Sequence, residues 1–230
     1  MIDTYNISKK HYFGKNHKYI KQILQFITKD DHKLLGDFIK VFYASFPMIN
    51  LNDENAEIFY LIATEALEFF KNAKNNNEQF RIYSPEFIED SNDFTIIETI
   101  NSDVPFILDS ILIYLKRNQI KVLRTIHPII HSYRDAKHDL VSFKSDGNSK
   151  LFIESHIHIH IQKIEDRQLI NKIIKDIAFI LSNVNLAVGD WQKMNSRLEE
   201  CIQPMQELAG KDDIFNERAE FLSQLKKRIF

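Results

Sequence analysis

The chain has one cysteine in 230 residues, Cys201, so it cannot form an intramolecular disulfide. A chain without disulfides is typical of a reducing compartment, and we expect a cytoplasmic protein. Glycine is also scarce, and the five glycines are isolated from one another: Gly14, Gly36, Gly147, Gly189 and Gly210. The sequence therefore lacks a glycine-rich phosphate loop and a Gly-x-Ser-x-Gly nucleophile elbow, and no cofactor is expected to bind this chain.

A strong excess of charge and a long apolar run are missing as well. The net charge is -2 and the pI is about 6.5, so no overall field attracts nucleic acid or anionic lipid. The N-terminus is polar, unlike a signal peptide, and no apolar run approaches the ~20 residues of a membrane span. Hydrophobic residues make up 44% of the chain, which is enough for a sizeable core. We expect a soluble protein with no nucleic-acid or membrane partner.

Residues 1–78 are predicted to form a helical N-terminal region. From residue 17 to residue 46 apolar residues recur at spacings of three and four, which predicts two amphipathic helices separated at Asp30 and Asp31. Asp53 can cap a third helix, which should end in the asparagines before residue 78. The period changes after those asparagines, which predicts a domain boundary there.

Residues 79–188 are predicted to form an α+β domain. Short strands suit the segments after residue 79, a helix capped by Asp103 follows, and further strands cover 121–134, 139–143 and 151–162. A helix over 166–181 completes the order β-α-β-β-α. A last short strand over 184–188 would finish a ferredoxin-like βαββαβ unit, in which helices cover an antiparallel sheet. Residues 189–230 are predicted to be a C-terminal helical segment that leads towards a missing remainder.

Three histidines alternate with isoleucines in the strand over 151–162. His156, His158 and His160 should share one face, and the isoleucines should point to the core. The first and third imidazoles would lie roughly 13 Å apart, too far for one zinc ion with bonds of about 2.1 Å. A metal site would need two of them and a ligand from elsewhere. The candidates for that ligand are His127, His131 and His138. The favoured interpretation is a half-exposed face whose histidines meet water, a helix or a subunit interface.

Polar groups also interrupt the apolar helix and strand over 101–135. Asp109 and Ser110 lie on a helix that is apolar on nearly every other side, and burying such groups without partners is costly. The partner of Asp109 must come from the following strand, where Arg124, His127 and Arg134 are available. We favour a buried network that ties the helix to the sheet, although the helix N-terminus could hold a small carboxylate. The complete candidate polar cluster or regulatory ligand site is Asp103, Asp109, Ser110, His127, Arg134 and Glu154.

A series of short motifs runs through the second half of the chain. Its members are Asp103, Pro105-Phe106, Asp109-Ser110, His127-Pro128, Arg134-Asp135, Glu154-Ser155, Asp190-Trp191 and Met194. Their order and spacing resemble the N-terminal region of the large bacterial NAD-specific glutamate dehydrogenases. The chain departs from that family's pattern at Val104, where a methionine is usual, and in the number of strand histidines. The resemblance is thin before about residue 80.

The resemblance implies that residues 79–188 form an ACT-like domain. The family it points to is a cytoplasmic, homo-oligomeric enzyme of amino-acid catabolism that oxidatively deaminates L-glutamate to 2-oxoglutarate and ammonium with NAD. Its catalytic lysines and dinucleotide fold belong to a later region. The resemblance therefore implies a non-catalytic, regulatory or oligomerisation portion, inactive alone. Its partners would be the remainder of the dehydrogenase, other subunits and a small amino-acid effector.

Two other hypotheses remain open at this point. The first is a stand-alone metal-binding protein that uses two of the histidines His156, His158 and His160. The second is an interaction scaffold in which another subunit covers the same strand face.

Overall fold

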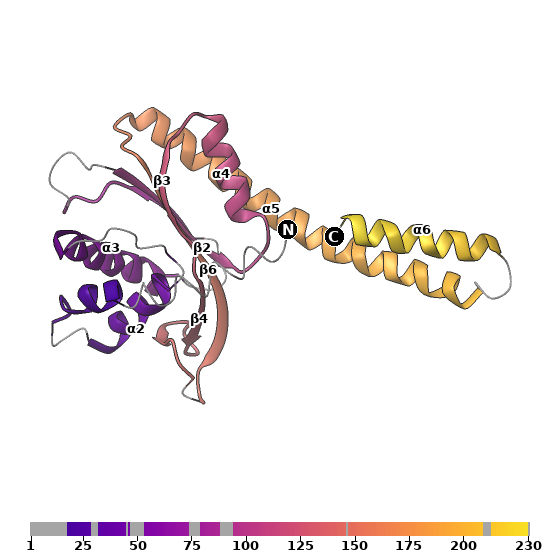
Figure 1. Cartoon of the computed structure of the whole chain (residues 1–230), viewed down its shortest axis with the longest axis horizontal. Coiled ribbons are helices and arrows are strands. Elements are labelled where there is room, and N and C mark those ends of the chain that lie inside the picture. Colours follow the sequence, from indigo (N-terminus) through magenta and orange to yellow (C-terminus); the bar gives the residue numbers. More distant parts are fainter. Residues whose placement is uncertain are drawn as a thin grey trace. The chain divides into compact units, whose positions relative to one another are not determined.

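A computed structural model describes residues 18–28, 32–44, 46, 53–73, 79–87, 94–145, 147–208 and 213–229. The fold is α+β, with a mixed helical and antiparallel-sheet architecture. The chain divides into two compact units, residues 1–180 and 181–230. The first unit contains the sheet and the helices that cover it (Figure 1).

The strands of the described residues lie in one six-stranded sheet of order β1-β2-β6-β4-β5, in which β3 also pairs with β6. Every pairing is antiparallel. In chain order the strands are β1 (Gln79–Tyr83), β2 (Phe94–Ser102), β3 (Val122–Ile126), β4 (Ile129–Arg134), β5 (Leu140–Ser142) and β6 (Lys150–Gln162). The predicted short strand over 139–143 and the long strand over 151–162 are thus confirmed, as β5 and β6.

The predicted strand over 121–134 is present but broken into β3 and β4 by His127 and Pro128. Both pieces pair with the single long strand β6. Proline has no amide hydrogen to donate to a sheet, but its carbonyl still accepts a hydrogen bond from the His156 amide at 3.1 Å. The break therefore bends the strand without separating it from β6.

Two layers of helices cover opposite faces of the sheet (Figure 1). One layer is α2 (His32–Phe42) and α3 (Asp53–Lys71), whose aromatic side chains share one core with sheet residues such as Ile96 and Ile130. The other layer is α4 (Ile107–Arg117) and the start of α5 (Arg167–Leu208). The Tyr114 hydroxyl of α4 donates to Asp176 of α5 at 2.8 Å. Three β6 isoleucines, Ile157, Ile159 and Ile161, are buried on this second side, and the β6 histidines are buried on the first.

The N-terminal helices match the expected pattern where they are described. Residues 18–24 are helical, and α2 and α3 follow. The predicted separators Asp30 and Asp31, and the asparagine run before residue 78, lie outside the described residues. Because these helices share a core with the sheet, they belong to the same compact unit. The domain boundary near residue 78 stays a prediction.

The last strand predicted for the βαββαβ unit is wrong. Residues 184–188 lie inside α5, which runs unbroken to Leu208. Buried apolar residues continue at helical spacing through this segment. They are Ile173, Ile177, Leu181 and Val188, each about one or two helical turns after the one before. The place beside β2 is taken instead by β1, which precedes the unit in sequence and pairs antiparallel to β2.

The expected cap of α4 is also wrong. Asp103 does not cap the helix; the N-cap is Phe106, whose φ of 73° is left-handed, and no side chain caps the first amides. Pro105 lies in the turn before the helix. By contrast, Asp166 starts α5 in the usual way, because its carboxylate accepts from the Gln168 amide at 2.8 Å.

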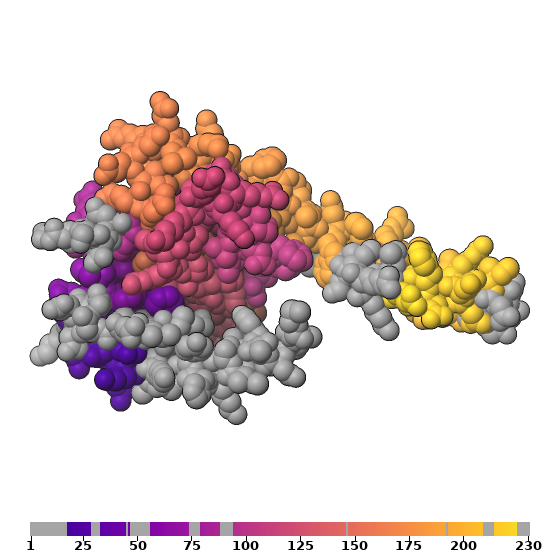
Figure 2. Space-filling view, turned by 45° about the horizontal axis from the view of Figure 1, so that its top comes forward, coloured from indigo at the N-terminus to yellow at the C-terminus, as the bar shows by residue number. Residues whose placement is uncertain are grey.

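The second unit pairs the end of α5 with α6 (Asp213–Ile229) in an antiparallel helical hairpin (Figure 1). In the space-filling view the yellow atoms of α6 lie against those of the end of α5 (Figure 2). Ile202 of α5 and Ala219 of α6 are buried. Met205, Phe221 and Leu222 line a shallow groove between the two helices. None of the described helices combines the length and the apolar character that crossing a bilayer requires.

Candidate functional site

A fully buried carboxylate, that of Glu98, lies in the middle of β2. It is fully inaccessible to solvent, and it is the only charged residue of that strand. Its register partner on β6 is His158, while His156 faces Ile100 and His160 faces Ile96. Because alternate strand residues share a face, the carboxylate and all three imidazoles lie on the side covered by α2 and α3.

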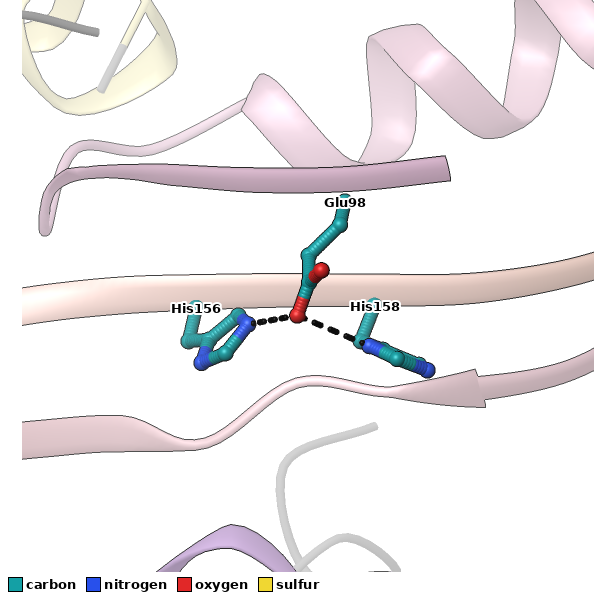
Figure 3. A group of neighbouring side chains, drawn as sticks. All are labelled: Glu98, His156 and His158. Carbon is teal, nitrogen blue, oxygen red and sulfur yellow. Dashed lines mark hydrogen bonds and ion pairs between the residues drawn. The ribbon is translucent and has the colours of Figure 1, made fainter. Parts of the chain in front are cut away.

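The Glu98 carboxylate binds two of these histidines through one oxygen (Figure 3). Its Oε1 lies 2.7 Å from His156 Nε2 and 3.0 Å from His158 Nδ1. The chain of contacts continues from His158 Nε2 to His160 Nε2 at 3.0 Å. The His160 ring stacks on Phe94 with centroids 4.3 Å apart. One carboxylate thus organises three imidazoles along β6.

The second Glu98 oxygen binds Arg81 of β1. Oε2 accepts from Arg81 Nη2 at 2.6 Å and from Nε at 2.7 Å, in a close charge-assisted contact. The same guanidinium donates to the Glu65 carbonyl of α3 at 2.9 Å and lies over the Phe69 ring at 4.5 Å. Arg81 therefore neutralises the buried carboxylate and connects it to the helical layer.

The electrostatics of the site fit an ionised Glu98 with neutral His156 and His160. Burial opposes ionisation of Glu98, but the His158 charge and the hydrogen bonds from His156 and His158 outweigh it and hold its pKa well below the usual range. Burial lowers the pKa of His156, against the pull of Glu98, and burial, His158 and Arg124 lower the pKa of His160 further. A neutral His156 that donates from Nε2 leaves Nδ1 as a buried acceptor, and Nδ1 has no hydrogen-bond partner among the described groups.

Aromatic side chains from the helical layer close the site. The His156 ring lies 6.0 Å from Phe38, 5.2 Å from Phe42 and 5.7 Å from Phe70, measured between centroids. The strand histidines are at most 1% exposed. The histidine face was expected to be half-exposed and to meet water, a helix or a subunit interface. It meets helices, and the expected half-exposure is wrong. The face is therefore closed to another subunit.

Glu98, His156 and His158 also place three metal-ligand atoms within 4.8 Å of one another. Their donor types suit zinc, and Glu98 supplies the ligand from another strand that the sequence argument required. Arg81, however, already neutralises the carboxylate, so a divalent ion would leave an excess positive charge in a site lined by aromatic rings. A metal-ligating His156 would also bury an Nδ1–H group that has no acceptor. The arrangement favours a hydrogen-bonded network over a metal centre.

A second network contains two residues of the predicted cluster, Arg134 and Glu154. Arg134 Nη2 donates to Glu154 Oε1 at 3.1 Å and Nε donates to Oε2 at 3.2 Å. Nη2 also donates to the Phe70 carbonyl of α3 at 3.0 Å, and Nη1 donates to the His138 carbonyl at 3.2 Å. Ser132 donates to the same carboxylate. This pair ties the sheet to α3, on the same side as Glu98.

The other predicted residues lie on the opposite side of the sheet, near the start of α4. His127 Nε2 is 2.8 Å from Ser155 Oγ, and burial lowers its pKa, against the opposing charges of Asp103 and Asp109. Asp103 and Asp109 are exposed and Ser110 is half-buried. The expected single buried cluster is therefore wrong, because alternation along β4 and β6 sends Arg134 and Glu154 to the α3 side.

Sequence reasoning missed Glu98 and Arg81, which organise the site. A signal was present for Glu98, since it is the only charged residue in the run Phe94 to Ile100. Arg81 gave no such signal, because a single arginine in a short strand is ordinary. Its role depends on the pairing of β1 with β2, which places Arg81 opposite Glu98.

An antiparallel sheet with helices on both faces, closed by buried ion pairs, defines the chain as an α+β protein. The family described as "Glutamate dehydrogenase, ACT1 domain" matches residues 38–177, more than half of the chain, and the chain belongs to that family. An NAD-specific glutamate dehydrogenase of Halomonas elongata is 24% identical over 194 residues. That alignment covers 82% of this chain and 12% of the relative, so the chain spans only a small part of the relative's length. No solved structure matches the chain.

Replacing Glu98 by glutamine should destabilise the protein strongly. The variant deprives the largely buried Arg81 of its close counter-charge at 2.6 Å, which should cost about 3 kcal/mol of unfolding free energy. Glu65→Gln is the matched control, because Glu65 is the other carboxylate near Arg81, at 3.7 Å, and is half-exposed. Its expected cost is below about 1 kcal/mol. Urea unfolding followed by circular dichroism measures both, and equal losses would contradict the central role of Glu98.

Acidification should destabilise the protein through the buried histidines. His156 and His160 have pKa values lowered from 6.5, so the unfolded chain takes up protons that the folded chain excludes. Their contribution is complete above pH 6.5 and declines as the pH falls below it, by about 1.4 kcal/mol per pH unit for each excluded proton. The lowered pKa of Glu98 adds a further loss below pH 4.5.

Urea titrations at a series of pH values measure this slope. His160→Phe should flatten it, because one excluded proton is removed while stacking on Phe94 is retained. His131→Asn is the control, since His131 is exposed on β4 and should leave the slope unchanged. An unaltered slope in His160→Phe would show that the buried imidazole does not govern the acid response.

The metal hypothesis has a direct test. Calorimetric titration of the chelator-treated chain with zinc should show no stoichiometric binding to the strand histidines, because Arg81 already balances Glu98. Stoichiometric zinc binding that His158→Gln abolishes and His131→Gln preserves would contradict this expectation.

Proposed function

We propose that this chain is a non-catalytic, regulatory and subunit-organising portion of an NAD-specific glutamate dehydrogenase. The observation that carries the proposal is the family match over residues 38–177, which includes both the helical layer and the sheet. In the proposed whole enzyme, L-glutamate is oxidatively deaminated to 2-oxoglutarate and ammonium with NAD. That chemistry belongs to a different region of the protein.

The geometry of the polar site supports a non-catalytic role. A catalytic group must reach its substrate, but Glu98, His156 and His158 are inaccessible to solvent. Both oxygens of Glu98 are already bound, one by Arg81 and the other by the two histidines. The network is therefore suited to holding β1, β2, β6 and α3 together.

The side of the sheet that carries α4 is more open, and it is where an amino-acid effector would bind. Asp103 and Asp109 are exposed there, Ser110 is half-buried, and the charges of both aspartates act on the half-buried His127. The first amides of α4 have no side-chain cap. An ammonium group suits the aspartates, and a carboxylate suits the amides and His127. Arg134 and Glu154 lie on the opposite face, outside this open site, and tie the sheet to α3.

The remaining parts of the proposal concern partners and location. The partners are the remainder of the dehydrogenase and further subunits, in a homo-oligomer of the cytoplasm. The single exposed cysteine, Cys201, agrees with a reducing compartment.

Calorimetric titration with L-glutamate, L-aspartate, L-arginine and other amino acids tests the regulatory part. We expect saturable heat with one of them, which Asp109→Asn should weaken because it removes a charge from the open face. Asp190→Asn is a matched control on an exposed carboxylate of α5. An absence of heat with every amino acid would leave only the subunit-organising role. The chain alone should produce no NADH from glutamate and NAD, and measurable production would refute the non-catalytic assignment.

A further inference from the structure

The buried histidines of β6 lie where the helical layer of α2 and α3 meets the sheet. His156 and His158 are inaccessible to solvent, and so is nearly all of His160. The Phe42 ring of α2 lies 5.2 Å from the His156 ring and 5.4 Å from the His158 ring, measured between centroids. We term this contact, with its three imidazoles, the histidine interface. The imidazoles are shielded from water only while α2 and α3 remain on the sheet.

The histidine interface already contains positive charge that an added proton would increase. The Arg81 charge acts on His156, and the Arg124 charge acts on His160. Glu98 is the carboxylate that contacts the imidazoles in the described part of the chain, and Arg81 already binds it at 2.6 Å. Burial first, and then these positive charges, lower the pKa of His156 and of His160 against the pull of Glu98. Both imidazoles gain a proton more readily in water, so acid favours any state in which the interface is open.

Other ionisable groups surround the imidazoles on every element packed against them. Burial raises the pKa of Tyr43, after α2, and of Tyr83 on β1, so both phenols stay neutral in acid. The lowered pKa of Glu98 keeps this carboxylate ionised above pH 4.5. The remaining groups are Asp37 of α2 with Lys40 and Lys144, Glu65 of α3, Arg81 of β1, Arg124 of β3, Arg134 of β4 and Glu154 of β6. Among these residue types only histidine ordinarily titrates between about pH 5 and pH 8, so the imidazoles govern the response in that range.

The opposite face of the sheet is held by contacts that mild acid does not affect. Ile157, Ile159 and Ile161 of β6 are fully buried on that side, as are Ile111 of α4 and Ile177 of α5. Backbone pairing joins β6 to β2, β3 and β4. Apolar contacts and backbone hydrogen bonds take up no proton near neutral pH, so the sheet should stay folded with α4 and the start of α5 when the histidine interface weakens.

The helical layer can separate from the sheet as one unit. Helices α2 and α3 both precede β1 in the chain, so their departure breaks none of the strand pairings described above. The layer has its own internal contacts, because the Tyr43 hydroxyl donates to the Phe59 carbonyl at 2.8 Å and the two rings pack edge to face. Arg81 and Arg134 join the layer to the sheet through carbonyl oxygens of α3, at 2.9 Å and 3.0 Å. Opening therefore exchanges these bridges and the aromatic contacts for water.

We propose that the histidine interface is a pH-sensitive switch, at which mild acid opens α2 and α3 away from the sheet while the sheet, α4 and the start of α5 stay folded. Local openings of this kind cost less free energy than global unfolding. Below pH 6.5, each imidazole that is neutral in the closed form and protonated in the open form shifts the opening equilibrium about tenfold per pH unit. Above pH 6.5 the interface stays closed. The switch lies on the face opposite the proposed effector site at α4, so acid would act as a signal independent of that site.

Hydrogen–deuterium exchange of the full chain, followed by mass spectrometry at about pH 7.5 and pH 5.5, tests the proposal. After correction for the intrinsic exchange rate at each pH, the protection factors of α2 and α3 amides should fall between about tenfold and a hundredfold. That range corresponds to about one factor of ten for each of the two excluded protons. The amides of β6 and α4 should change by less than about threefold, because their contacts are outside the switch.

Variants of His160 assign the response to the imidazoles. His160→Gln stays neutral at both pH values and can still form a hydrogen bond with His158, so the fall in α2 and α3 protection should be about tenfold smaller. His160→Phe, which retains the ring contact with Phe94, provides a second variant if His160→Gln does not fold. His131→Gln is the matched control, because His131 is exposed on β4 and should leave the fall unchanged.

Three results would overturn the proposal. The first is equal protection of α2 and α3 at the two pH values. The second is a loss of protection in β6 and α4 as large as that in α2 and α3, which would mean global unfolding. The third is an undiminished fall in a folded His160 variant.

Discussion

The ion pair between Arg81 and Glu98 sets the conditions under which the rest of the first unit can fold. A carboxylate in the centre of a sheet cannot be covered by aromatic side chains unless its charge and both its oxygens are bound. Arg81 supplies the charge, and His156 and His158 occupy the remaining oxygen. Only then can α2 and α3 close over this face.

A second carboxylate of the sheet is bound by an arginine in the same way, at another point of α3. Arg81 joins Glu98 to the Glu65 carbonyl, and Arg134 joins Glu154 to the Phe70 carbonyl. In both places a planar guanidinium bridges a sheet carboxylate and a backbone oxygen of α3, which a lysine could not do with the same geometry. Each arginine also lies over a phenylalanine ring of that helix. Two such bridges determine both the position and the rotation of α3 on the sheet.

The two faces of the sheet consequently differ in what they can do. The α3 face is closed by aromatic rings and ion pairs, so its polar groups stabilise the fold and respond to acid. The opposite face carries α4 with its uncapped first turn, and beyond it the uncovered end of β4 and β6. Effector binding, as proposed above, belongs to this more open side.

Local pattern in the sequence was enough to predict the α+β class, the helices α3 and α4, the strands β2, β5 and β6, and the family. These depend on periodicity and on short motifs, which are properties of neighbouring residues. The last strand was missed because a five-residue apolar segment fits a strand as well as a continuing helix. Only the place of β1 beside β2 shows that the sheet needs no further strand there.

The sequence by itself also determined that His156, His158 and His160 share a face, since that follows from strand alternation. It did not determine whether that face meets water, metal or protein. The tertiary structure decided this, because the residues that bind and cover it come from β1, β2, α2 and α3, far away along the chain. Likewise, Arg134 and Asp109 belong to the same stretch of sequence, but they lie on opposite sides of the sheet. Which buried charges pair depends on long-range strand register and layer packing, which no local pattern encodes.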